Sequence, residues 1–126
     1  MIVKHKDELR GTPRAVETKD WSTIRFLLRE DGLGFTVTDV TLAAGMDSVM
    51  QYKHHLEACY CLEGEAVLED VATGERHRIL PGTLYALSNH ERHRLRVVKP
   101  TRLVSIFSPA LVGREVHDKD GSFPLL

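Results

Sequence analysis

The sequence predicts an all-β fold in which antiparallel strands form a sandwich or barrel, and two observations support this class. Apolar and polar residues alternate with a period near two along most of the chain, as in half-buried strands. Turn-forming residues separate these runs at short intervals, and no segment of helical length and period lies between them. Short strands at this spacing are typical of antiparallel barrels and sandwiches.

The expected strands follow one another along the whole chain. In order they are residues 24–28, 35–42, 49–52, 58–62, 66–71, 76–80, 84–87, 95–98 and 103–107. Turn chemistry predicts the breaks between them at Asp31-Gly32, Ala44-Gly45, Glu63-Gly64, Thr73-Gly74, Pro81-Gly82, Ser88-Asn89 and Lys99-Pro100. Residues 7–10 and 13–17 favour short helical turns instead.

A single domain over residues 1–126 is expected, because the chain contains no repeat, low-complexity tract or linker. Its 126 residues are 42% hydrophobic, which suffices for one core. The tail, residues 112–126, is polar and then apolar. We expect it to pack back over the barrel as a lid.

The charge balance argues against binding to nucleic acid or to a membrane surface. Seventeen Lys and Arg residues nearly balance eighteen Asp and Glu residues, for a net charge of -1. No apolar run approaches the ~18 residues that a membrane span needs, so we expect a cytoplasmic protein. Cys59 and Cys61 share one face of a strand, where two small buried residues are expected in preference to a metal pair.

Residues 45–64 resemble the first of the two sequence motifs of the cupin superfamily, which are small double-sheet β-barrels with a metal in the barrel mouth. In that motif a Glu precedes a turn glycine, as Glu57 precedes Gly64 here. The two histidines that usually bind the metal are replaced by Gln51 and Lys53. The resemblance implies a cupin-type double-sheet jelly-roll barrel with short N-terminal and C-terminal extensions.

Residues 81–98 resemble the second cupin motif, whose metal-binding histidine falls at His93. Strand alternation places Arg92, Arg94 and Arg96 on one face and therefore turns His93 inward. Tyr85 is the candidate for the missing ligand. Carboxylate, phenolate and imidazole from Glu57, Tyr85 and His93 suit Fe(II), with Mn(II) or Zn(II) possible. The alternative is that all three are ordinary buried residues with satisfied hydrogen bonds.

Three further residues are candidates for proton transfer. His55 has the strand parity of Glu57 and is expected to face the same pocket. Glu115 and His117 lie two residues apart in an extended part of the tail, so they share a face. Carboxylate and imidazole can move protons if the tail closes the pocket. The alternative is a solvated tail.

The chain resembles the ectoine synthase family from end to end. The strings that carry the resemblance are LLREDGLGFT, YKHHLEACYCLEGE, PGTLYALSNHERH and GREVHDKDGSFPL, with an early Trp21. That family makes a bacterial compatible solute that protects against osmotic stress, closing N-γ-acetyl-L-2,4-diaminobutyrate into ectoine with loss of water. The resemblance implies iron at Glu57, Tyr85 and His93 and a cytoplasmic homodimer. It implies substrate contacts from Trp21, Arg25, Tyr52, His55, Phe107, Glu115 and His117.

Four positions depart from the usual family residues: Thr38, Val40, Glu91 and Ser105. Val40 and Ser105 fall at expected substrate contacts, and Val40 lacks a hydroxyl that a polar substrate would use. Two other functions therefore stay open. One is a related enzyme that acts on another N-acetylated diamino acid or hydrolyses the ring, and the other is a non-catalytic cupin that binds a small ligand.

The expected reaction is attack of the substrate's α-amine on its own acetamide carbonyl, followed by loss of water. A metal at Glu57, Tyr85 and His93 would polarise that carbonyl. Proton transfer is expected from Glu115 and His117, with His55 in reserve. Arg25 would bind the substrate carboxylate, and Trp21 and Phe107 would form walls of the pocket.

Overall fold

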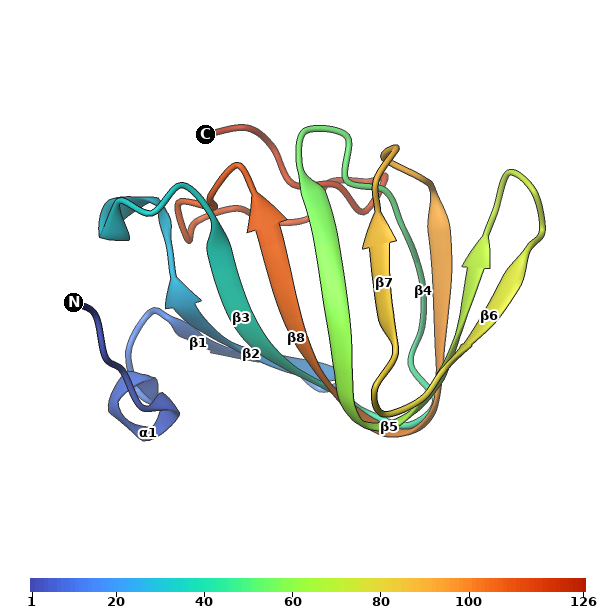
Figure 1. The fold of residues 1–126 in the computed structure, drawn as a ribbon, viewed down its shortest axis with the longest axis horizontal. Coiled ribbons are helices and arrows are strands. Elements are labelled where there is room, and N and C mark those ends of the chain that lie inside the picture. Colours follow the sequence, from blue (N-terminus) through green and yellow to red (C-terminus); the bar gives the residue numbers. More distant parts are fainter.

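The computed structural model describes residues 1–126 and consists almost entirely of β-strands (Figure 1), which confirms the predicted class. Its elements in chain order are α1 (Lys6–Leu9), β1 (Ala15–Glu17), β2 (Trp21–Leu27), the 3-10 turn η1 (Arg29–Asp31), β3 (Thr36–Leu42), β4 (Asp47–Met50), β5 (Leu56–Asp70), β6 (Arg76–Ile79), β7 (Leu84–Leu87) and β8 (His93–Ser108). All neighbouring strands are antiparallel. No helix has the length and hydropathy of a membrane span.

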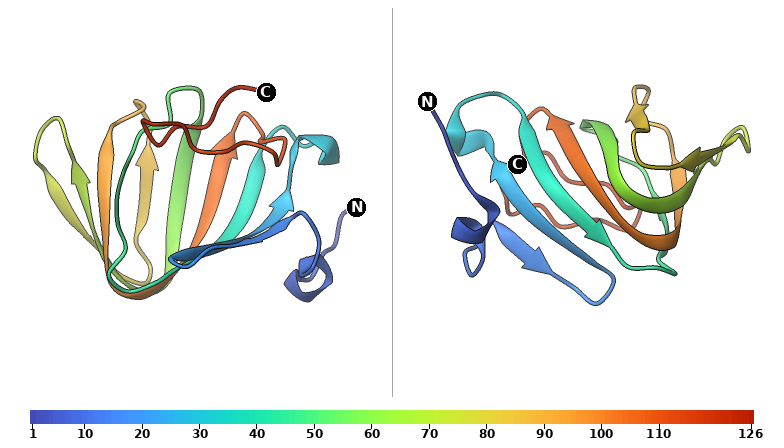
Figure 2. Two further views of the ribbon diagram at one scale, coloured as in Figure 1. Left: turned by 180° about the vertical axis from the view of Figure 1, so that it is seen from behind. Right: turned by 60° about the horizontal axis from the view of Figure 1, so that its bottom comes forward.

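Two long strands, β5 and β8, each belong to both layers of the barrel. Residues 101–108 of β8 pair with β3 and with the first part of β5, whose other edge carries β7. Residues 93–97 of β8 pair with β4 and with the last part of β5, whose other edge carries β6. Both strands bend through the closed lower end in Figure 1, and the view in Figure 2 with the bottom turned forward shows the same bend.

The predicted turns at Glu63-Gly64 and Lys99-Pro100 are wrong, because both segments are bends inside continuous strands. The pairing between β5 and β8 shifts register around Glu63 and Glu65. Bulges of this kind let one strand pass from one layer to the other. Gly64 has a φ of 98°, and a Cβ there would lie 2.6 Å from the Cα of Thr101 and overlap the Pro100 carbonyl oxygen. Only glycine fits this crossing.

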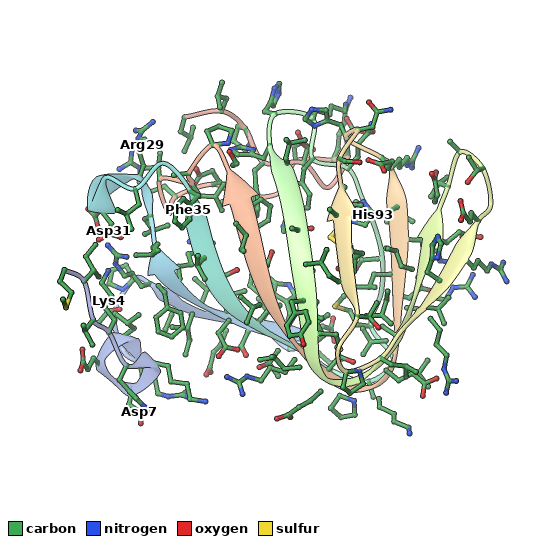
Figure 3. All side chains as sticks on the ribbon, in the orientation of Figure 1. Lys4, Asp7, Arg29, Asp31, Phe35 and His93 are labelled. Atoms are coloured by element: carbon green, nitrogen blue, oxygen red, sulfur yellow. The ribbon has the colours of Figure 1, made fainter.

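The N-terminal part differs from the prediction at two places. Residues 15–17 form β1, paired with residues 22–24 of β2, so the helical turn expected at 13–17 is wrong. The first long strand begins at Trp21, three residues before the predicted 24–28. Pairing with a neighbouring strand overrides the weak local preference of such short segments. Lys4 reaches Asp31 with an Nζ to Oδ1 distance of 3.1 Å and fixes the N-terminal segment against η1 (Figure 3).

The inward faces of the strands form two apolar clusters. The larger one fills the barrel from the bottom and contains Leu42, Cys59, Cys61, Ala66, Leu68, Ile79, Leu95, Val97 and Leu103. The second contains Leu28, Tyr52, Leu87, Phe107, Leu111 and Phe123. Both cysteines are free and buried, as their spacing predicts. Tyr85 packs against both clusters and therefore lies at their junction.

The C-terminal tail crosses the open end of the barrel, where it lies along the top of Figure 1 and of the rear view in Figure 2. Leu111 and Phe123 are buried in the second cluster. The Ser122 hydroxyl accepts a hydrogen bond from the backbone N–H of Lys53 at 3.0 Å, and the Lys53 ammonium pairs with Asp120. The tail is thus held by apolar and polar contacts at several points.

Candidate functional site

Strand register brings residues from five strands into one row on the inner face. Arg25 of β2 lies opposite Thr38 of β3, and Thr38 lies opposite Ser105 of β8. Ser105 and Tyr85 both lie opposite Cys59 of β5. Directly opposed residues on antiparallel strands point to the same side of the sheet. The row therefore joins three predicted site residues, Arg25, Ser105 and Tyr85, with Cys59, which we did not single out for the site.

Glu57 lies in the adjacent row, opposite both Phe107 of β8 and Leu87 of β7. Its Oε2 accepts a hydrogen bond from the Ser105 hydroxyl at 2.7 Å. Burial of the carboxyl group raises its pKa to about 7, and the Ser105 hydrogen bond offsets only part of this rise. A cation beside the carboxylate would remove the cost of keeping it ionised at this depth.

His93 begins β8 and is 2% exposed, on the inner face as predicted. Figure 3 labels it beside β7. Its Nδ1 lies 2.9 Å from the backbone oxygen of Glu91. A carbonyl oxygen only accepts, so Nδ1 carries the ring proton and Nε2 keeps a lone pair with no protein partner. This arrangement is typical of histidines that bind metals. Burial also lowers the pKa of His93, which keeps the imidazole neutral.

Tyr85 is the third predicted ligand, and its hydroxyl lies within hydrogen-bonding reach of the Cys59 thiol. Burial raises the pKa of Tyr85, and the neighbouring Cys59 and Glu57 add to the rise. Tyr52 lies near all three predicted ligands, because its ring centroid is 6.2 Å from that of His93, the charge of Glu57 raises the pKa of Tyr52, and Tyr52 in turn raises the pKa of Tyr85. The three ligands thus belong to one neighbourhood.

The structure fits a metal in the chemistry of its donors. No group of three or more His, Cys, Asp and Glu side chains is placed to hold an ion. A site here therefore depends on the phenol oxygen of Tyr85 beside Glu57 and His93. Carboxylate oxygen, phenolate oxygen and a neutral imidazole nitrogen are ligands that Fe(II) accepts.

His117 lies in the tail and contacts the aromatic residues of the second cluster. Its Nε2 is 2.9 Å from the Tyr52 hydroxyl oxygen, and its ring stacks on Phe123 with centroids 4.2 Å apart. Burial among these aromatic residues lowers the pKa of His117, and the positive charge of Arg25 lowers it further. At neutral pH the imidazole is therefore uncharged and can accept a proton.

Glu115 has a different environment from His117, although the two residues are close in sequence. Its carboxylate accepts hydrogen bonds from the backbone N–H groups of Val112 and Gly113 at 2.6 and 2.7 Å. Burial raises its pKa, but these backbone hydrogen bonds outweigh the effect and the pKa is lowered. Arg25 donates to the Gly113 carbonyl oxygen at 2.7 Å. Glu115 thus stabilises the turn of the tail that Arg25 holds.

The remaining predicted residues lie on the same inner side. His55 is 2% exposed, and its Nδ1 is buried without any hydrogen-bond partner. Its ring lies edge-on to Phe107 and Phe123, with centroids 6.3 and 6.5 Å away. Trp21 and Val40 are partly buried and pack against the larger apolar cluster.

A surface cavity of about 690 Å³ lies away from this site. It lies beside α1 on the side of β2 and β3, and none of the predicted residues lines it. Its lining mixes both charges, including Lys6, Glu17, Asp39 and Arg102. The tail and its aromatic residues cover the barrel mouth, where the predicted site lies.

Two contributors were missed by sequence reasoning. Cys59 lies two residues after Glu57, on the same face of β5, and directly opposite Tyr85, so the period-two spacing of the sequence already places it beside Glu57. Phe123 stacks on His117, but its role depends on the path of the tail, which no periodic pattern encodes.

Comparison with known proteins identifies the family and the fold. The sequence model of the family described as ectoine synthase matches residues 1–126. An L-ectoine synthase from Desulfosudis oleivorans is 47% identical, covering 100% of this chain and 98% of that protein. The crystal structure of ectoine synthase from P. lautus superposes with a TM-score of 0.89 at 46% identity, covering 100% of this chain and 91% of that one. A Cupin_2 domain of an XRE family transcriptional regulator from Enterobacter cloacae matches at 17% identity with a TM-score of 0.60, covering 71% of this chain and 97% of that one, which shows the cupin fold alone.

Proposed function

The chain belongs to the ectoine synthase family, and from this membership we propose that it is a hydro-lyase that closes N-γ-acetyl-L-2,4-diaminobutyrate into ectoine with loss of water. The observation that carries the proposal is the inner row that joins Arg25, Ser105 and Tyr85 next to Glu57, beneath a tail that brings His117 to the same end. A charged clamp, a candidate metal set and a neutral base thus converge on one enclosed place.

Glu57, Tyr85 and His93 are the residues proposed to hold an Fe(II) ion, with Mn(II) or Zn(II) as alternatives. When bound, the ion supplies Lewis-acid polarisation of the amide carbonyl. The support is the unprotonated Nε2 of His93, the second carboxylate oxygen of Glu57, which Ser105 does not bind, and the phenol oxygen of Tyr85 on the same inner face.

The chain's own residues bind and orient the substrate. Arg25 is buried and donates to the tail through one guanidinium nitrogen, which leaves other N–H groups for the substrate carboxylate. Phe107 and Trp21 supply apolar walls on either side of this row. Holding a flexible diamino acid with its amine against its own amide can supply about 7 kcal/mol or more of the rate enhancement.

Proton transfer is assigned to His117, because its neutral imidazole can take a proton from the substrate ammonium so that the amine can attack. Tyr52 holds the ring through the 2.9 Å contact with Nε2. Glu115, the other predicted member of the pair, stabilises the tail turn through both oxygens, so its contribution is to place the tail and Arg25. His55 is the alternative base, since its Nδ1 has no protein partner.

The tail acts as a lid in this proposal. It excludes water from the amine and the polarised amide, and it carries His117 into the mouth. The family membership also supports a cytoplasmic homodimer.

The decisive experiment supplies anaerobically purified protein with Fe(II) and N-γ-acetyl-L-2,4-diaminobutyrate and measures ectoine by chromatography. We expect ectoine, and we expect Glu57→Ala and His93→Ala to lose both bound metal and product. Turnover only of a substrate with one methylene more or less would favour the related enzyme, since Val40 presents methyl groups to the interior. A protein that binds no metal, and that turns over neither this substrate nor its longer and shorter homologues, would favour a non-catalytic binding role.

A further inference from the structure

Ser105 stands at the centre of a buried chain of three polar side chains. The Cys59 thiol donates to the Ser105 hydroxyl oxygen with Sγ and Oγ 3.6 Å apart. The Ser105 hydroxyl donates in turn to Oε2 of Glu57 at 2.7 Å. Cys59 and Ser105 are 2% and 1% exposed, so solvent reaches neither. The sheet register that places Cys59 opposite Ser105 fixes this geometry.

The direction of these hydrogen bonds follows from the donors available. A serine hydroxyl has one proton, and a carboxylate only accepts, so the proton of Ser105 points at Glu57. Cys59 then occupies the hydroxyl's accepting side. Thr38 approaches from the other strand but donates to the Ser105 backbone oxygen at 3.2 Å and leaves the side chain alone. The one proton of the Ser105 hydroxyl is therefore used by Glu57 and is not available to a substrate.

We propose that Ser105 is a positioning residue that holds the Glu57 carboxylate so that Oε1 faces the metal. This inference rests on the proposed function, in which Glu57 is a metal ligand. It replaces the substrate contact expected at this position from the family resemblance. A short O–H to carboxylate hydrogen bond is stronger than the weak bond a thiol makes, so serine here restrains the carboxylate more than cysteine would.

The test compares the Fe(II) affinity of four proteins by anaerobic titration of the metal-free form. Ser105→Ala is expected to weaken binding about 10- to 100-fold, the usual effect of removing a group that orients a ligand. Ser105→Thr keeps the hydroxyl and is expected to bind within a few-fold of wild type. Thr38→Val is the matched control, because it removes a neighbouring buried hydroxyl that does not touch Glu57.

Two outcomes would overturn the inference. One is wild-type Fe(II) affinity in Ser105→Ala. The other is a raised KM in Ser105→Ala that excess Fe(II) does not restore, because a weakened metal site is rescued by more metal and a lost substrate contact is not. If Ser105→Ala fails to fold in thermal unfolding, Ser105→Cys decides, with an affinity expected between alanine and wild type. A wild-type protein that binds no Fe(II) would instead overturn the metal assignment itself.

Discussion

The buried Glu57 carboxyl group predicts a distinctive pH dependence of stability in the metal-free protein. Glu57→Gln is the informative change, because glutamine has the same shape and can still accept the Ser105 hydrogen bond but carries no charge. Any difference in stability between the two proteins therefore reports the cost of ionising this side chain at its place in the barrel.

The size and sign of the effect follow from the pKa of Glu57, which rises from 4.5 to about 7 on folding. At 1.36 kcal/mol for each pH unit, a rise of about 2.5 corresponds to roughly 3 kcal/mol. Because the pKa is raised in the folded state, the stabilisation is present below pH 4.5 and is lost as the pH rises through about 7. Metal-free Glu57→Gln should match wild type near pH 4.5 and exceed its stability by up to roughly 3 kcal/mol at pH 8.

Urea unfolding of both metal-free proteins across this pH range measures the difference directly. Glu115→Gln is the matched control, since the pKa of Glu115 is lowered by its backbone hydrogen bonds and its ionised form stabilises the folded state. That variant should be less stable than wild type at neutral pH. A Glu57→Gln protein that is no more stable than wild type at pH 8, or a difference that does not change with pH, would refute the reasoning. Saturating Fe(II) should reverse the order, because glutamine is a poor substitute for a carboxylate ligand.

Three other changes have defined outcomes. Gly64→Ala should lower the free energy of unfolding by more than the roughly 1–2 kcal/mol of left-handed backbone strain, since its Cβ overlaps Pro100, whereas Gly45→Ala has open space and should show the strain alone in urea unfolding. Truncation after Val112 should leave a folded barrel that binds Fe(II) by titration but has lost ectoine formation, and near-normal turnover would move the base role to His55. His117→Ala should lower kcat more than it raises KM in steady-state assays, and the reverse would make His117 a binding residue.

Alternation in the sequence predicts most of the strands and the direction of the side chains that matter. His93, His55 and Cys59 are buried, as the period-two alternation predicts. Arg92, Arg94 and Arg96, which alternate with His93 and Leu95, are not buried. Period-two patterns work here because each layer of the barrel has one wet and one dry face. The same alternation predicts that Glu57 lies on the inner face, without any knowledge of the strand pairing.

The two wrong turn predictions, at Glu63-Gly64 and at Lys99-Pro100, have one physical cause. Gly64 and Pro100 are residues typical of turns, yet here each lies at a bend inside a continuous strand, Gly64 in β5 and Pro100 in β8. Local turn chemistry cannot distinguish a chain reversal from a strand that changes layer, since both need a backbone that few residues adopt. Local sequence patterns could not predict the contacts of the tail either, because the hydrogen bond between Tyr52 and His117 joins residues 65 positions apart.

The position of β8 sets the order in which the barrel can be assembled during translation. β8 pairs with β3, β4 and β5, which all leave the ribosome before it does. Until β8 emerges, β3 can pair only with β2, and β5 only with β6 and β7. Neither layer is complete in the nascent chain, and the exposed strand edges are open to pairing with other chains. Completion of both layers therefore waits for β8, the last strand in chain order, which joins them.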